Sequence, residues 1–64
     1  MNAVEAKEKY EFELLKHGAS FVAADPDSNT LIIAVKDPEV VEWAKAHIKG
    51  VRLKFIKGGE MVAW

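Results

Sequence analysis

The sequence predicts an α+β domain, a two-layer αββαββ sandwich in which two helices cover one face of a four-stranded sheet. Leu31 to Val35 are five consecutive apolar residues rich in β-branched types, as in a strand buried on both faces. Asp37-Pro38 follows with the residues preferred at a helix N-cap and first turn. The predicted order of a helix, a glycine and a pair of strands occurs twice along the chain, with the glycines at positions 18 and 50.

The first helix is expected from Asn2 to His17. Asn2 and Glu5 have the spacing of a capping box, and Gly18 suits the left-handed position that ends a helix. The apolar residues fall on two faces: Ala3, Ala6, Tyr10 and Leu14 on one, and Val4, Phe12 and Leu15 on the other. We expect one face to pack on the sheet and the other to contact the second helix, with the Lys7–Glu11 ion pair between them. The alternative is that the second face binds a partner.

A β-hairpin should follow the first helix. Ala19 to Ala24 is expected as its first strand and Thr30 to Val35 as its second. The residues between them, 25–29, are Asp, Pro, Asp, Ser and Asn, which favour a turn. The hairpin loop should therefore have about five residues.

The second helix is expected from Pro38 to about Lys49, with Gly50 after its end. Trp43 and His47 flank its buried stripe, which comprises Val40, Val41, Ala44 and Ile48.

The chain should close with a strand over Val51 to Phe55, a turn at residues 57–60 and a last strand over Met61 to Trp64. This order is the ferredoxin-like βαββαβ unit with its first strand moved to the end. In that arrangement the strands at 30–35 and 61–64 are central. A KH-like or other α+β arrangement remains open, because a pattern of elements fixes topology poorly.

The composition indicates one soluble domain over residues 1–64. The chain has no cysteine and a net charge of −1, and its charges are mixed along the sequence. Nucleic acid and anionic membranes are therefore not expected as partners, because both require a basic surface. No apolar run approaches the roughly 18 residues of a membrane span, and no signal peptide is recognised, so a chain expressed as given is expected in the cytoplasm.

No group of residues has the pattern of a catalytic site, and we expect neither an enzyme nor a cofactor. Asp25, Asp27 and Asn29 have the spacing that opens a calcium loop, but Thr30 and Lys36 replace its required glycine and glutamate. A hydrogen-bonded hairpin turn explains them better. His17 and His47 suit helix C-termini, and two histidines without a third ligand make a poor metal site.

The sheet face away from the helices is the candidate functional surface, for self-association or for a protein partner. Alternation places small and apolar residues there, including Ala24 and Ala34, where an open sheet normally carries polar ones. The alternative is that these are ordinary exposed apolar residues. The candidate partner-binding residues are Val22, Ile32, Arg52, Lys54, Val62 and Trp64.

The segment from Gly18 to Ile48 resembles the N-domains of bacterial secretins. Val22-Ala23-Ala24-Asp25, Leu31-Ile32-Ile33 and the Pro38-started helix ending in Ile48 are the matching parts. The resemblance implies a non-enzymatic periplasmic module that builds rings.

The whole chain also resembles de novo designed miniproteins. Its caps, its glycines after both helices, its Ala/Glu/Lys-rich helices and its β-branched strands all favour the same fold. This resemblance implies an idealised, non-catalytic scaffold.

Overall fold

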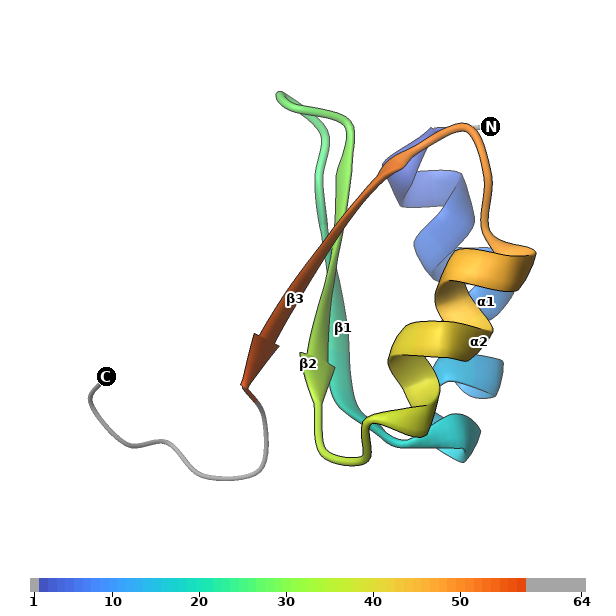
Figure 1. The fold of residues 1–64 in the computed structure, drawn as a ribbon. Coiled ribbons are helices and arrows are strands. Elements are labelled where there is room, and N and C mark those ends of the chain that lie inside the picture. The colour runs from blue at the N-terminus through green and yellow to red at the C-terminus, as the bar shows by residue number, and fades with distance from the viewer. Residues whose placement is uncertain (1, 58–64) are drawn as a thin grey trace.

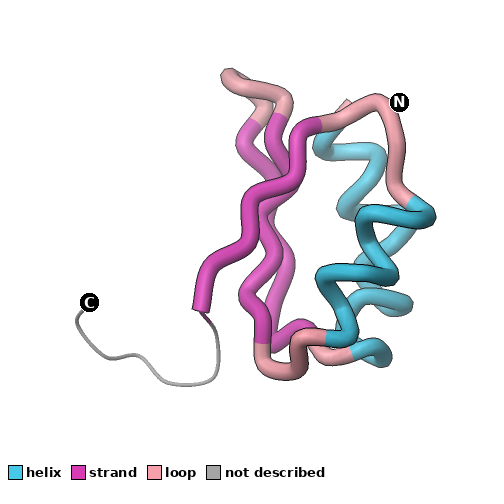
Figure 2. Tube along the Cα trace, viewed as in Figure 1, coloured by secondary structure: helices cyan, strands magenta, loops and turns pink. Residues whose placement is uncertain are grey.

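The computed structural model describes residues 2–57, which form two helices and three strands (Figure 1). Both helices lie on one side of the sheet, so the domain has two layers (Figure 2). The elements in chain order are α1 (Ala3–His17), β1 (Ala19–Asp25), β2 (Thr30–Val35), α2 (Glu39–His47) and β3 (Arg52–Lys57).

The ends of α1 are those that the sequence predicts. The Asn2 side chain accepts a hydrogen bond from the Glu5 amide at 2.9 Å, and the Glu5 carboxylate accepts one from the Asn2 amide at 3.1 Å. Gly18 follows the helix with φ 124°, a conformation that side chains with a Cβ rarely adopt. The Gly18 carbonyl also accepts the amides of Lys36 and Asp37, which ties the end of α1 to the start of α2.

The helix α2 starts one residue later than predicted, with Pro38 rather than Asp37 at its N-cap, and it is shorter than expected. The Asp37 carboxylate accepts a hydrogen bond from the Glu39 amide at 3.0 Å, as a capping side chain does. The helix ends at His47, and Ile48 is extended with φ −105° and ψ 114°. Buried residues of its predicted stripe are Val40, Ala44 and Ile48, with Val41 partly buried.

The strand at residues 30–35 is central, as predicted. The sheet has the order β1-β2-β3, with β1 antiparallel and β3 parallel to β2. Leu31 and Ile33 are fully buried and pack with Leu14 of α1 and Val40 of α2 in one core cluster.

The prediction of a four-stranded, permuted ferredoxin-like sheet was wrong, because over residues 2–57 the sheet is three-stranded and mixed. That prediction placed residues 61–64 beside β2, but β3 occupies this position and pairs with β2 over six residues. The chain returns from α2 to the free edge of β2, and the helix supplies the crossover that a parallel pair needs. The expected turn at residues 57–60 begins at Lys57, which is the last residue of β3. The rest of that turn and the expected last strand at residues 61–64 lie outside the described residues.

The second apolar face of α1 is largely exposed, although the prediction gave both faces a packing partner within the chain. Val4, Phe12 and Leu15 are 44%, 86% and 41% exposed. Tyr10 and His17 of α1 contact α2 instead, because that helix lies on the other side of the α1 core stripe. The three exposed residues, which we call the α1 outer stripe, face away from the core.

Candidate protein interface on the open sheet face

The side of the sheet away from the helices, here called the open face, carries three rows of side chains. The rows follow from the strand register, since residues paired across neighbouring strands point to the same side. They run from β1 through β2 to β3 as Asp25, Thr30 and Arg52; Ala23, Ile32 and Lys54; and Phe21, Ala34 and Ile56.

The third row is the apolar part of this face. Phe21 is 46% exposed, and Ile56 is partly buried. Ala34 lies between them in the register and is fully buried, but it is not part of the core cluster beneath the helices. Neither Phe21 nor Ile56 is packed against that cluster. These side chains therefore contribute little to the core and present an apolar surface on the opposite side.

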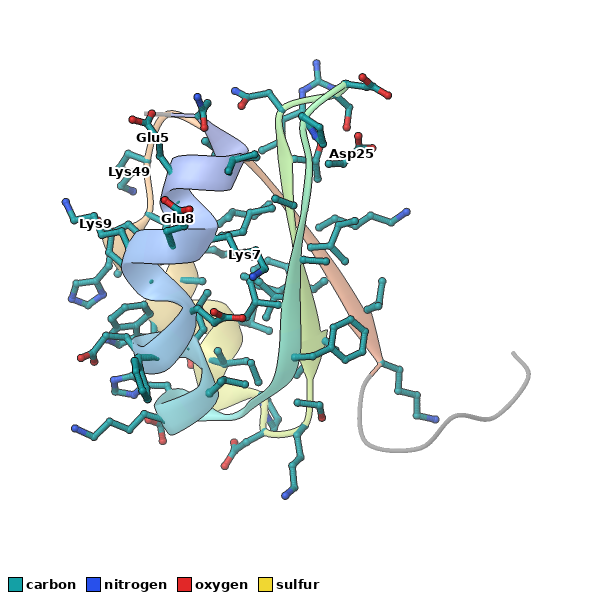
Figure 3. All side chains as sticks on the ribbon, turned by 180° about the vertical axis from the view of Figure 1, so that it is seen from behind. Glu5, Lys7, Glu8, Lys9, Asp25 and Lys49 are labelled. Carbon is teal, nitrogen blue, oxygen red and sulfur yellow. The ribbon has the colours of Figure 1, made fainter. Side chains whose placement is uncertain are left out.

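Charges lie at one end and along one side of the face. Arg52 and Lys54 are exposed on β3, as the sequence predicts, and Asp25 lies across the sheet on β1. Figure 3 shows Asp25 at the hairpin end of the sheet. The face thus combines an apolar row with an acidic and a basic residue at opposite edges.

Ile32 lies at the centre of this surface. It pairs with Ala23 on one side and Lys54 on the other, and it is partly buried. The structure therefore places Ile32, Arg52 and Lys54 on the open face. Val62 and Trp64, the other residues predicted there, lie outside the described residues.

Val22 is not on the open face, and its predicted position was wrong. Its side chain is only 6% exposed and belongs to the core cluster, where it pairs with Ile33. The predicted five-residue loop would pair Ala24 with Thr30, whereas the structure pairs Asp25 with Thr30 and leaves a four-residue loop. A shift of one residue turns the side chains of residues 21–24 to the other face. Ala24 moves with Val22 to the helix side, while Ala34 keeps its predicted side.

The residues of the face that the sequence interpretation missed are Phe21, Ala23, Asp25, Thr30 and Ile56. A β-bulge between Ala19 and Phe21 lets Ala19 and Val22 both face the helices while Phe21 faces outward. The only sequence signal for this register is in the turn. Asp25 accepts hydrogen bonds from the Asp27 amide at 3.1 Å and the Ser28 hydroxyl at 3.0 Å, so it closes the loop from the last strand position.

The same hydrogen bonds account for the residues with calcium-loop spacing. Both carboxylate oxygens of Asp25 have partners within the turn. The Asn29 side chain accepts a hydrogen bond from the Ala3 amide at 2.8 Å, which joins the hairpin to the start of α1. These oxygens stabilise the turn and do not converge on a common point.

A second cluster joins the two helices, which run antiparallel (Figure 1). The Trp43 indole stacks on the imidazoles of His17 and His47, with ring centroids 4.8 Å and 4.5 Å away. Tyr10 meets the same indole edge-on at 6.0 Å. His17 Nδ1 lies 3.1 Å from the Glu39 carboxylate, and its Nε2 lies 3.8 Å from Glu13. Trp43 of α2 therefore contacts one histidine from each helix.

Metal ligands and membrane-spanning helices are the remaining features that bear on function. Within residues 2–57, no group of three or more histidine, aspartate and glutamate side chains has an arrangement that could hold a metal ion. The two helices that the structure describes are both too short or too polar to cross a membrane. Comparison with protein families, curated proteins and solved structures gives no match, so the inference of function rests on the geometry above.

Proposed function

We propose that this chain is a small, non-catalytic interaction protein that associates with protein through its open face, and first with copies of itself. The observation that carries the proposal is the row formed by Phe21, Ala34 and Ile56. It is apolar, it lies outside the core cluster, and it continues through Ile32. An antiparallel hairpin face that meets only water normally carries polar side chains.

A designed origin is part of the same proposal. It is supported by the agreement between local sequence signals and the structure at α1, where the capping box and the terminal glycine are both present. An idealised scaffold needs no site within its core, and its outward faces are then the places where function can be added.

The experiment that tests the proposal is sedimentation equilibrium over a concentration series to about 1 mM, a range that detects weak self-association. We expect a concentration-dependent dimer that Ile32→Lys abolishes, because the substitution places a charge at the centre of an apolar contact. Phe12→Lys is the matched control, since Phe12 is an 86% exposed apolar residue on the helical side. It should leave the dimer unchanged. Association that survives Ile32→Lys and is lost in Phe12→Lys would contradict the proposal.

A ring-building module of the secretin N-domain type is the second candidate. One observation favours it: the chain has two separate exposed apolar surfaces, the open face and the α1 outer stripe of Val4, Phe12 and Leu15. A ring needs two different surfaces that meet head to tail, whereas a dimer needs one. Assemblies larger than two that are lost in both Ile32→Lys and Phe12→Lys would favour the ring.

A further inference from the structure

We infer that the occupant of the open face is a second copy of this chain, related by a twofold axis that runs along the strands. This inference rests on the proposed function and names its partner and geometry. The evidence is that each row of the face, read from β1 to β3, is complementary to the same row read from β3 to β1. A twofold axis along β2 exchanges the β1 side of one copy with the β3 side of the other and keeps each row level.

In the first row, the exchange brings opposite charges together. Asp25 of each copy faces Arg52 of the other, because these residues occupy the two ends of the same row. The contact occurs twice in the dimer. Both oxygens of Asp25 accept hydrogen bonds within the turn, but a carboxylate has about four acceptor positions and keeps some for a guanidinium.

The other two rows bring apolar groups together. Phe21 of each copy faces Ile56 of the other, and Ala34 lies beneath this contact, already fully buried within its own chain. Ile32 lies on the axis and faces Ile32, with Lys54 over the small Ala23 at either side.

The other in-plane twofold axis gives a poor fit. An axis perpendicular to the strands would reverse the order of the rows, so that Asp25 faced Phe21 and Arg52 faced Ile56. Both charges would lose water against apolar side chains. The axis along the strands also gives nearly aligned sheets, which is one of the two common ways in which sheets pack face to face.

The size of the face sets the expected strength. Three strands of about six residues cover a footprint of about 14 Å by about 20 Å at ordinary strand spacing. This area is smaller than one side of a standard protein interface, so we expect a weak dimer with a dissociation constant in the range of about 10 μM to about 1 mM.

Charge reversal tests the first row. Arg52→Asp places two aspartates opposite each other at both edges of the first row and should weaken the dimer at least about tenfold. Adding Asp25→Arg to the same chain restores opposite charges and should recover most of the loss. The control is Lys49→Asp, which makes the same reversal at an exposed lysine outside the sheet. It should leave the dimer unchanged.

Crosslinking tests the other rows without depending on the Asp25 turn. The chain has no cysteine, so each introduced cysteine is the sole thiol of its chain. With a short bismaleimide that spans the separation of packed sheets, Ile32→Cys should crosslink to itself. Phe21→Cys mixed with Ile56→Cys should form the mixed crosslink in preference to either self-crosslink. Lys9→Cys, on α1, should form none.

The outcomes separate this inference from the proposed function. If Ile32→Lys abolishes association but the double reversal gives no recovery and Phe21→Cys crosslinks to itself, the twofold geometry is wrong and the open face remains the interface. If the chain stays monomeric to about 1 mM, or associates only through Phe12, both are wrong.

Discussion

At the scale of single residues, Gly18 is the most constrained position in the fold. It has φ 124°, and a Cβ built on it would lie 2.5 Å from the Asp37 Cβ and 3.0 Å from the Asp37 carbonyl oxygen. Backbone strain and steric overlap therefore exclude other residues at the same position. The close approach lets the Gly18 carbonyl accept the amides of Lys36 and Asp37.

We expect Gly18→Ala to lower the free energy of unfolding by about 3 kcal/mol, because it adds both left-handed strain and a clash with backbone. Gly50→Ala is the matched control, since Gly50 is exposed and has φ 85°. This control should lower the free energy of unfolding by only about 1 kcal/mol. Urea denaturation followed by circular dichroism measures both, and equal losses would contradict the packing described at Gly18.

Asn29 connects three elements. Its φ of 53° lies in the left-handed region, its side chain accepts the Ala3 amide of α1, and its carbonyl accepts the Arg52 amide of β3 at 3.1 Å. Asparagine tolerates this backbone conformation better than most residues, and its side chain here satisfies an unpaired donor of the first helical turn.

Asn29→Ala should therefore destabilise the fold by about 2 kcal/mol, through the lost hydrogen bond and the strained backbone together. Asn29→Gly removes the same hydrogen bond, but glycine adopts positive φ without strain. This variant should therefore lose about half as much unfolding free energy. Thermal denaturation of the two variants separates the contributions. If glycine costs as much as alanine, the backbone conformation is not a factor.

At the scale of elements, the orientation of β1 decides which side chains form the open face. Val22 is in the core and Phe21 is outside, although phenylalanine is the larger apolar residue. A hairpin loop of four residues instead of five produces this orientation, and the bulge after Ala19 keeps both ends of the strand in contact with the core.

Val22→Lys should lower the free energy of unfolding by more than about 3 kcal/mol, because it buries an unpaired charge. Phe21→Lys should cost about 1 kcal/mol or less, since its site already contacts water. Chemical denaturation of the two variants tests the register directly. A larger loss of unfolding free energy for Phe21→Lys than for Val22→Lys would contradict this register and support the orientation predicted from the sequence.

At the scale of the whole molecule, the elements were more predictable from sequence than their arrangement. The span of β2, the capping box of α1 and the glycine after it were predicted correctly, because residue types near each other in the chain determine them. The pairing of β3 with β2 was not predicted, because alternation in β3 identifies its two faces but not the strand beside it. The same limit applies to β1, where a hairpin loop shorter by one residue moved Val22 from the predicted site to the core.

The edges of the sheet also bear on how the molecule associates. In the described residues, β1 and β3 are the outer strands. β3 carries Arg52, Lys54 and Lys57, which are exposed, and charged side chains on an edge strand oppose edge-to-edge pairing. Extension of the sheet through β3 is therefore opposed.

The most direct test of the account is a dilution series followed by the backbone amide signals of the isotope-labelled chain in solution NMR. If the open face is the interface, concentration-dependent shifts will concentrate on β1, β2 and β3, with the largest changes near Phe21, Ile32 and Ile56, and will spare the outer side of α1. Shifts centred on Val4, Phe12 and Leu15, or none up to about 1 mM, would contradict it.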